Sequence, residues 1–353
     1  MFNPANELEG LTLDGGWKVV DKIDLRRLTT GGAFSIGYNV ENNGKQGFLK
    51  ALDYSILTRV PPDQRITLIE KMSSAFIFEK NLCIQCRDEN LRRVVHPIAD
   101  GQYVFEDEDE ILVNWVDYII FPRAKGDLRD QMSGIDSFDL AWRLRALHHI
   151  TIGLQELHYR GIAHQDLKPS NTLVFEGEGT KISDLGSASV RGRGTPAPRD
   201  EELIAGAHNY APPELLYGLR IEDWTKRRYG CDAYLLGSLV AYFFSQVTLT
   251  HQLISKLDLT HQPAVWNGTY EEVLIYIYDA WDKVIKEIED DIDAFSADDY
   301  KSDIIECIKQ LTNPDPTKRG HPTEIKIKSN QYSLERYVSL FDRLAQTAEY
   351  WHR

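Results

Sequence analysis

Short-period alternation of apolar and polar residues marks the first third of the chain and is typical of half-buried β-strands. The pattern predicts strands at 19–25, 36–40 and 48–52. Asn43-Gly44 lies between the last two strands and predicts a tight hairpin, because both turn positions need a positive φ. A helical pattern then covers about 63–86, and further strands are expected up to about residue 121. The N-terminal part is therefore expected to be a small sheet with one main helix.

The hydrophobic period changes to 3.6 residues from position 140 onward, which is typical of amphipathic helices. One helical face there carries Leu140, Leu144, Leu147, Leu154 and Leu157. Gly161 supplies a C-terminal stop for this helix. Most of the remaining chain has a helical pattern, including a final helix at about 333–350. The pattern predicts an α+β protein with a small β-rich N-terminal lobe and a larger, mainly helical C-terminal lobe.

The composition is that of a globular protein, with 353 residues of which 42% are apolar and 27% are charged. A chain of this length buries enough surface to fold without a disulfide or a structural metal. These values exclude an intrinsically disordered chain, a collagen-like repeat and a disulfide scaffold. The formal net charge of −14 argues against a protein that binds nucleic acid mainly through its phosphates.

Cysteine usage and hydropathy bear on the compartment. Cys83 and Cys86 form a lone Cys-x-x-Cys inside a helical pattern, which predicts core packing rather than a metal or redox site. The N-terminal residues do not follow the pattern of a signal peptide. The longest apolar stretch, 233–244, is too short to span a bilayer. We therefore expect a cytoplasmic protein that does not insert into a membrane.

The segment 164–171 reads His-Gln-Asp-Leu-Lys-Pro-Ser-Asn, and Asp184 begins an Asp-Leu-Gly segment 13 residues after Asn171. Two short strands joined by a turn at 177–179 are predicted between them. Because such a hairpin brings its two ends together, Asp166, Asn171 and Asp184 are expected to meet. Phosphoryl transfer needs this set, namely oxygen ligands for Mg²⁺ and a carboxylate beside the attacking hydroxyl.

These motifs, together with Ala-Pro-Pro-Glu at 211–214, resemble those of the eukaryotic-like protein kinase superfamily. The resemblance is to a divergent member of the Ser/Thr type. It implies that Asp166 is the catalytic base and that Lys168 contacts the γ-phosphate of ATP. It also implies that Asn171 and Asp184 are the Mg²⁺ ligands.

The resemblance extends upstream to Phe48-Leu49-Lys50, which matches the Val-Ala-Ile-Lys strand of the family. Lys50 would then contact the α- and β-phosphates and pair with a glutamate on the following helix, where Glu70 and Glu79 compete. Neighbours at i±3 and i±4 share a helical face. Those around Glu79 are mainly apolar, whereas those around Glu70 are mostly polar. Glu79 is therefore the expected partner of Lys50, and Glu70 is expected on a solvated face.

The resemblance also implies a nucleotide-binding surface. A glycine-rich loop in which only Gly32 keeps the family spacing would cover the phosphates. In the hinge, Ile120 would be the gatekeeper, and adenine would bond the Phe121 carbonyl and the Arg123 N–H. Asp127 would bind the ribose hydroxyls. The full set expected to bind the nucleotide is Thr30, Gly31, Gly32, Phe34, Ser35, Lys50, Phe121, Arg123 and Asp127.

Two more matches imply structural roles. Asp232 lies in a match to the family's Asp-x-Trp-x-x-Gly motif and would hold the backbone of the catalytic loop. Glu214 of the Ala-Pro-Pro-Glu motif and Arg319 of the segment 313–319 would form a buried ion pair.

The sequence departs from the family at two informative positions. Gln165 replaces the arginine that pairs with a phosphate on the activation segment, which is residues 184–214 here, so we expect activity without phosphorylation of that segment. The segment still carries the hydroxyl residues Ser187, Ser189 and Thr195. Ala207 replaces a threonine that contacts the catalytic Asp and Lys. This departure weakens the assignment of a protein substrate more than it weakens phosphoryl transfer.

Together these features predict a bilobal protein-kinase-like fold with an N-lobe at 1–122, a C-lobe at 123–330 and a C-terminal helical extension at 331–353. The predicted activity is transfer of phosphate from ATP, with Mg²⁺, to Ser/Thr hydroxyls of a protein. Two alternatives stay open: a small-molecule phosphotransferase of related fold, and a pseudokinase that acts as an interaction scaffold. The acidic stretches 106–110 and 270–295 are expected to be solvated faces, with docking of a basic partner as the alternative. The last helix could cap the large lobe or bind a partner.

Overall fold

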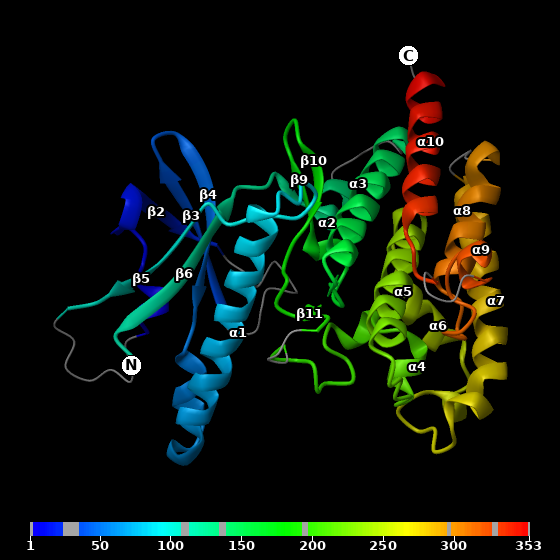
Figure 1. Cartoon of the computed structure of the whole chain (residues 1–353), viewed down its shortest axis with the longest axis horizontal. Helices are drawn as coiled ribbons and strands as arrows, with labels where there is room; N and C mark the ends of the chain where they lie inside the picture. The colour runs from blue at the N-terminus through cyan, green and yellow to red at the C-terminus, as the bar shows by residue number, and fades with distance from the viewer. Residues whose placement is uncertain are drawn as a thin grey trace.

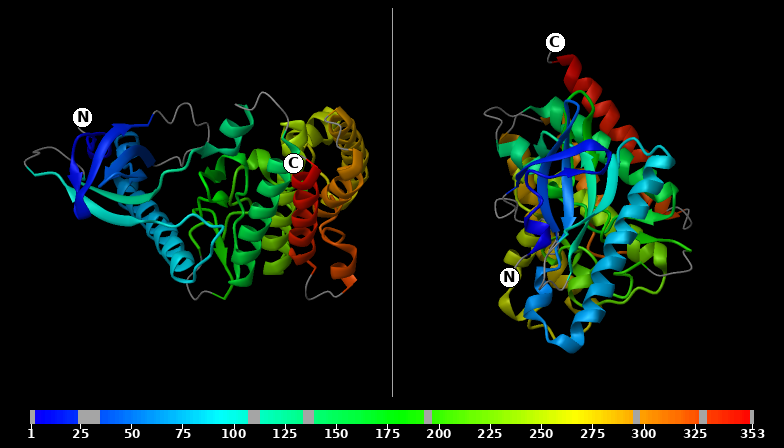
Figure 2. Two further views of the ribbon diagram at one scale, coloured as in Figure 1. Left: turned by 90° about the horizontal axis from the view of Figure 1, so that it is seen from above. Right: turned by 90° about the vertical axis from the view of Figure 1, so that its left-hand side faces the viewer.

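The computed structural model describes residues 3–23, 35–106, 113–133, 139–192, 197–294, 298–326 and 331–351. They form two lobes that lie beside each other along the longest axis of the molecule, a smaller one built on a sheet and a larger one that is mostly helical (Figures 1 and 2). The predicted α+β bilobal architecture is confirmed.

The N-lobe contains an antiparallel sheet with the strand order β1-β2-β3-β4-β6-β5. Its strands are β1 (Thr12–Leu13), β2 (Trp17–Lys22), β3 (Ser35–Asn42), β4 (Lys45–Leu52), β5 (Ala99–Val104) and β6 (Trp115–Pro122). Asn43 and Gly44 join β3 to β4 with φ values of 48° and 79°, as the hairpin prediction requires. The predicted strand 19–25 corresponds to β2, and residues 24–34 lie outside the described part of the chain.

Helix α1 (Pro62–Asp88) packs on one face of this sheet (Figure 1). Its start at a proline suits the first helical turn, where no backbone N–H is needed. Leu52 and Ile119 of the sheet pack in one apolar cluster with Phe76 of α1. Leu49 and Ile120 belong to a separate cluster on the opposite face. Because side chains alternate along a strand, β4 and β6 present every second residue to α1.

The C-lobe follows β6 with short strands and a series of helices. The strands are β7 (Gly126–Asp127), β8 (Ile162–Ala163), β9 (Thr172–Phe175), β10 (Gly179–Ile182) and β11 (Ser189–Val190). The helices are α2 (Leu128–Ser133), α3 (Leu140–Tyr159), α4 (Pro213–Leu216), α5 (Trp224–Ser245), α6 (Leu249–Lys256), α7 (Tyr270–Ala294), α8 (Asp298–Leu311), α9 (Pro322–Lys326) and α10 (Glu335–Trp351). β9 and β10 form the hairpin that was predicted between Asn171 and Asp184.

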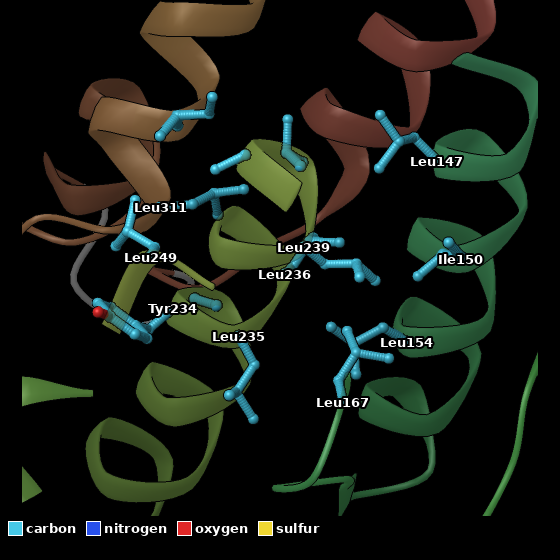
Figure 3. Packing of buried hydrophobic residues seen from close by; sticks show 14 of the residues in the cluster. Leu147, Ile150, Leu154, Leu167, Tyr234, Leu235, Leu236, Leu239, Leu249 and Leu311 are labelled. Atoms are coloured by element: carbon cyan, nitrogen blue, oxygen red, sulfur yellow. The ribbon is translucent and has the colours of Figure 1, made fainter. Parts of the chain in front are cut away.

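The core of the C-lobe lies between α3 and α5. Leu147, Ile150 and Leu154 of α3 point toward Leu236 and Leu239 of α5 (Figure 3). All five leucines of the predicted helical face are buried. The chain leaves α3 through the predicted stop, where the glycine has a φ of 70°. Burial of this face supplies the main stabilisation of α3, since helices of this length are held chiefly by tertiary packing.

The final helix, α10, lies along α3 (Figures 1 and 2). Its side chains Tyr337, Phe341 and Leu344 are buried in the C-lobe core. Arg145 of α3 donates to Glu349 through Nε at 2.8 Å and through Nη2 at 3.0 Å. In the structure α10 therefore caps the large lobe, which is the first of the two roles left open by the sequence.

The acidic helix α7 is amphipathic. Ile277, Val284 and Ile288 are fully buried, whereas Asp290 is exposed. The side of α7 that carries Asp290 is therefore a solvated face, as expected. Most of the other acidic stretch, from residue 107 to 110, lies outside the described residues.

The cysteines Cys83 and Cys86 are free and buried in the core, as predicted. Among the helices of the described residues, no single one is long and apolar enough to cross a membrane, and α5 with α6 meets that test only as a pair bent by 85°.

Candidate active site

The ion pair between Lys50 and Glu79 joins the sheet to helix α1. Lys50 Nζ donates to both carboxylate oxygens of Glu79, at 2.7 and 2.8 Å. Lys50 reaches α1 because it lies on the face of β4 that packs on this helix. Glu79 is only 6% exposed, whereas Glu70 is exposed, as predicted for the two glutamates. Burial by itself lowers the pKa of Lys50, but the Glu79 and Asp184 carboxylates together outweigh burial and raise the pKa, so Lys50 stays charged.

Asp184 also lies near Lys50, with 3.9 Å between Lys50 Nζ and Asp184 Oδ1. Its backbone has a φ of 63°, an uncommon value for a residue other than glycine, and the Gly186 N–H donates to Oδ1 at 3.3 Å. Burial raises the pKa of Asp184, but Lys50, Lys168, His164 and the Gly186 N–H together lower it more strongly, so the pKa of this carboxyl lies below its ordinary value. An ionised carboxylate is thus held where the sequence predicted a metal ligand.

The side chain of Asp166 is held on both of its oxygens. Oδ2 accepts from Lys168 Nζ at 2.7 Å and from Asn171 Nδ2 at 3.0 Å. Oδ1 accepts from the backbone N–H of Ala207 at 2.8 Å. The structure therefore brings Asp166 and Asn171 together, as predicted, and places Lys168 beside them. Because each oxygen of Asp166 has a donor, the carboxylate is locked in a single orientation.

The contact from Ala207 was missed at the sequence level. We expected a lost interaction at Ala207, because a threonine hydroxyl was absent, yet the backbone N–H of the same residue now reaches the Asp166 carboxylate. A backbone N–H belongs to every residue except proline, so no residue type could have signalled this contact. Asp166 therefore keeps a hydrogen-bond donor from this segment, although the threonine hydroxyl is absent.

Gly206 makes this approach possible. A Cβ on Gly206 would lie 2.2 Å from the Gln165 carbonyl oxygen and 2.9 Å from Asp166 Oδ1. Gly206→Ala is therefore expected to push the segment off the catalytic loop and to lower kcat by about 10²-fold, the typical cost of a misplacement of about 1 Å. Steady-state kinetics with thermal melting and ATP binding as controls checks this result. A variant with normal kcat would show that the close approach is not needed for catalysis.

Asp232 holds the backbone of the catalytic loop, as the resemblance implied. Its Oδ2 accepts from the His164 N–H at 2.8 Å and its Oδ1 accepts from the Gln165 N–H at 2.7 Å. His158 of α3 is a further partner, with 2.8 Å between Nε2 and Asp232 Oδ2, and its ring stacks on Tyr229. His158 was not identified from the sequence, because its distance from Asp232 along the chain is bridged only by the packing of α3 on α5.

The predicted pair of Glu214 and Arg319 is present. Arg319 is fully buried and donates to the two carboxylate oxygens of Glu214 at 2.6 and 2.8 Å. Its other N–H groups donate to the carbonyls of Gly230 and Asn313, and Tyr234 presents its ring to the guanidinium at 5.2 Å. Every donor of this buried arginine is therefore used.

The prediction of Ile120 as the gatekeeper is wrong. Its side chain packs with Val40 on the face of the sheet that is turned away from α1 and Lys50. Ile119 and Phe121 lie on the α1 face instead. The motif match in the hinge cannot reveal this error, because a shift of one residue in a strand moves each side chain to the other face.

The two hinge groups expected to bond adenine are also engaged in the sheet. The Arg123 N–H donates to the Gln46 carbonyl, at 3.4 Å. Because bonded pairs alternate in an antiparallel ladder, the next bonded pair is Phe121 with Phe48, which lie opposite each other. On the other edge of β6, the Ile120 carbonyl accepts from the Ile98 N–H at 2.8 Å. Carbonyls alternate in direction along a strand, so the Pro122 carbonyl points to the same edge of β6 as that of Ile120. The pairing of β5 with β6 ends at Ala99 and Ile120, so Pro122 lies beyond it.

Asp127 lies at the N-terminus of α2 and is 5% exposed. Its Oδ2 accepts from Arg129 Nη2 at 2.6 Å, and its Oδ1 accepts from the Arg129 N–H at 2.8 Å. The carboxylate predicted to bind ribose is therefore already paired within the chain, and Arg129 would have to move for Asp127 to take that role.

The other residues predicted to bind the nucleotide are those of the glycine-rich loop. Ser35 begins β3. The remaining ones lie outside the described residues, namely Thr30, Gly31, Gly32 and Phe34.

A β-rich lobe with a Lys–Glu pair, set against a helical lobe that holds a base-like aspartate beside an asparagine and a second aspartate, defines a protein kinase domain. The family model for the protein kinase domain matches residues 89–331. The chain therefore belongs to the protein kinase family, and the predicted superfamily is confirmed. The matched residues begin at the end of α1, so the assignment of Lys50 and Glu79 rests on their ion pair.

Several Ser/Thr kinases are similar to this chain. It is 29% identical over 195 residues to the serine/threonine-protein kinase cds1 of Schizosaccharomyces pombe. The matched residues cover 52% of this chain and 40% of that protein. It is 27% identical over 271 residues to the serine/threonine-protein kinase H1 homolog of Pinctada fucata, covering 74% and 57%. The serine/threonine-protein kinase H1 of Mus musculus is 27% identical over 284 residues, covering 78% and 57%. The chain thus spans less than two thirds of the length of each of these relatives, and the similarity supports the predicted Ser/Thr class.

Proposed function

We propose that this protein kinase transfers the γ-phosphate of ATP, with Mg²⁺, to serine or threonine hydroxyls of a protein substrate. The observation that carries the proposal is the Asp166 carboxylate, held on one oxygen by Lys168 and Asn171 and on the other by the Ala207 N–H. A carboxylate fixed in this way can accept the proton of an incoming hydroxyl as that hydroxyl attacks phosphorus. Lys168, beside it, would contact the transferring phosphate.

Nucleotide binding would use both lobes. Lys50, whose charge is maintained by Glu79, would bind the α- and β-phosphates. The adenine base would bond the Pro122 carbonyl and the Ala124 N–H, one residue further along the chain than the sequence indicated, because the Arg123 N–H is used by Gln46.

The donors present fit Mg²⁺, a hard cation that prefers oxygen ligands. Asp184 is ionised, since its pKa lies below the ordinary value. Asn171 uses its Nδ2 on Asp166, so its Oδ1, which accepts from Ser170 Oγ at 3.4 Å, is the atom that would face a cation. Bound Mg²⁺ neutralises charge on the phosphates during transfer. Asp184 and Asn171 would hold it, and Lys50 would keep Asp184 in place.

The protein substrate is favoured over a small molecule by two observations. The names of the similar proteins describe Ser/Thr kinases. In addition, the end of the activation segment is anchored by the buried pair of Glu214 with Arg319, which lies between α8 and α9 and also donates to the Gly230 carbonyl of α5. The chain after Ala207 therefore leads from the catalytic carboxylate into the C-lobe core. The charge of −14 is compatible with a basic protein substrate.

One labelling experiment separates the three functions. The purified protein is incubated with radiolabelled ATP, Mg²⁺ and generic protein substrates, in parallel with Asp166→Asn and Lys50→Ala. Label on serine or threonine that both variants lose supports the protein kinase. ATP consumption that needs an added small molecule would instead support the small-molecule phosphotransferase. If no label appears under any condition and the protein does not bind Mg·ATP, the result would support a scaffold.

A further inference from the structure

The side chain of Gln165 connects the catalytic loop to the activation segment and to α5. Its Nε2 donates to the Ser187 carbonyl at 3.1 Å. Its Oε1 accepts from Nη1 of Arg228, a residue of the first turns of α5. The positive charge that the catalytic loop lacks at position 165 is therefore present at the same place, supplied by another element.

Arg228 extends from Gln165 to the middle of the activation segment. Its side chain is 3% exposed, and its Nη2 donates to the Asp200 carbonyl at 2.7 Å and to Asp200 Oδ1 at 3.3 Å. Hydrogen bonds between charged groups are stronger than those between neutral ones, and burial makes the loss of either partner costly. A single guanidinium thus joins the catalytic loop, α5 and the activation segment.

The carboxylate of Asp200 is in turn saturated by the segment around it. Oδ1 accepts from Ser189 Oγ at 2.5 Å, and Oδ2 accepts from the Ala197 N–H at 2.7 Å. Ser189 Oγ also accepts from Trp224 Nε1 at 3.1 Å. One anion therefore gathers the two ends of the stretch 189–197 and the start of α5. A phosphate paired with an arginine would do the same in a phosphorylated segment.

Two further arginines bind the same region. Nη2 of Arg227 donates to the Glu202 carbonyl at 2.7 Å. Arg199 pairs with Glu202 at 2.8 Å and donates to Ser187 Oγ at 3.1 Å. The chain from residue 199 to 202 is thus held on both sides, and Gly206 and Ala207 follow within a few residues.

We propose that Asp200 and Arg228 are positioning residues that take the place of an activation-segment phosphate: their ion pair holds the segment so that the Ala207 N–H stays on Asp166. The inference rests on the proposed kinase function and adds its regulation. The kinase would then be active as synthesised, with the anion encoded in the chain.

The hydroxyl groups nearest to the pair are in keeping with this role. Ser189 is fully buried and Ser187 is 7% exposed, and both hydroxyls take part in the network. Neither hydroxyl is accessible to another kinase while the segment is in place. Thr195 lies outside the described residues.

The first test compares Asp200→Asn with its neighbour Glu201→Gln, since Glu201 is exposed. Asp200→Asn is expected to lower kcat by about 3- to 30-fold while the KM for ATP stays unchanged, because the pair orients the segment and does not touch the nucleotide site. Glu201→Gln should behave as the wild type, and Asp200→Glu should recover part of kcat. A melting temperature measured for each variant separates loss of folding from loss of orientation. An Asp200→Asn enzyme with wild-type kcat would overturn the proposal.

The second test needs no variant. The wild-type protein is treated with phosphatase, its segment is confirmed to be unmodified by mass spectrometry, and its kcat is measured again. Unchanged kcat is expected; a loss of activity that returns on phosphorylation of the segment would overturn the proposal even if Asp200→Asn did not fold.

Hydrogen exchange keeps this inference separate from the proposed function. The amide of Ala207 is expected to be protected in the wild type and to exchange faster in Asp200→Asn. A wild-type protein without phosphotransfer would refute the proposed function, whereas equal protection in the two proteins would refute the role of the pair.

Discussion

Asp166→Asn is expected to lower kcat by about 10²–10⁴-fold, the usual contribution of a general base. The asparagine has nearly the same shape, but it cannot accept a proton, and its amide would place an N–H against one of the present donors. These donors are Lys168 and Asn171 on one oxygen and the Ala207 N–H on the other. The affinity for Mg·ATP should change little, because Asp166 is not among the residues proposed to bind the nucleotide. Steady-state kinetics and calorimetric titration with Mg·ATP measure the two quantities separately.

The matched control is Glu176→Gln, which removes a negative charge from the exposed turn between β9 and β10. It should leave both kcat and nucleotide affinity unchanged. If Asp166→Asn kept more than a tenth of the wild-type kcat, Asp166 would not be the base, and the phosphoryl transfer would have to use another group.

Arg319→Met is expected to lower the free energy of unfolding by about 3–5 kcal/mol, because it leaves the Glu214 carboxylate buried without its partner. Glu214 and Arg319 are 2% and 0% exposed, so water cannot replace the lost bonds. The carbonyls of Asn313 and Gly230 lose donors in the same change. Denaturant unfolding, with the m-value monitored to confirm a comparable transition, measures the difference.

The neighbouring Lys318 offers a control, since its side chain is 65% exposed. Lys318→Met should have little effect on the unfolding free energy. The double variant of Arg319→Met with Glu214→Gln should lose less than the sum of the two single changes, because it no longer leaves a buried charge unpaired. Losses that add up would mean that the two side chains contribute independently.

The ion pair of Lys50 with Glu79 shows how far local pattern reasoning can reach. The choice of Glu79 over Glu70 required only the helical period and the polarity of neighbouring residues, and the structure agrees. The hinge shows where such reasoning ends. Ile120 and Phe121 are both apolar, so their composition does not tell which one faces α1; the ladder between β4 and β6 decides it.

The network around the activation segment could not be read from the sequence at all. Gln165 suggested only that a charge was missing, whereas Arg228 stands 63 positions away and its role depends on how α5 packs under the catalytic loop. The Ala207 contact is made by a backbone group and leaves no mark in the residue type.

The sequence by itself therefore determined the two lobes, the main helices and the residues with chemistry at fixed short spacings, because hydrophobic period and motif spacing are local properties. It also identified the buried Glu214–Arg319 pair by resemblance. Only the tertiary structure decided which face of β6 meets Lys50, which groups hold Asp166, and that α10 caps α3. These are contacts between segments that are distant along the chain, and they depend on strand register and helix packing, which no local pattern specifies.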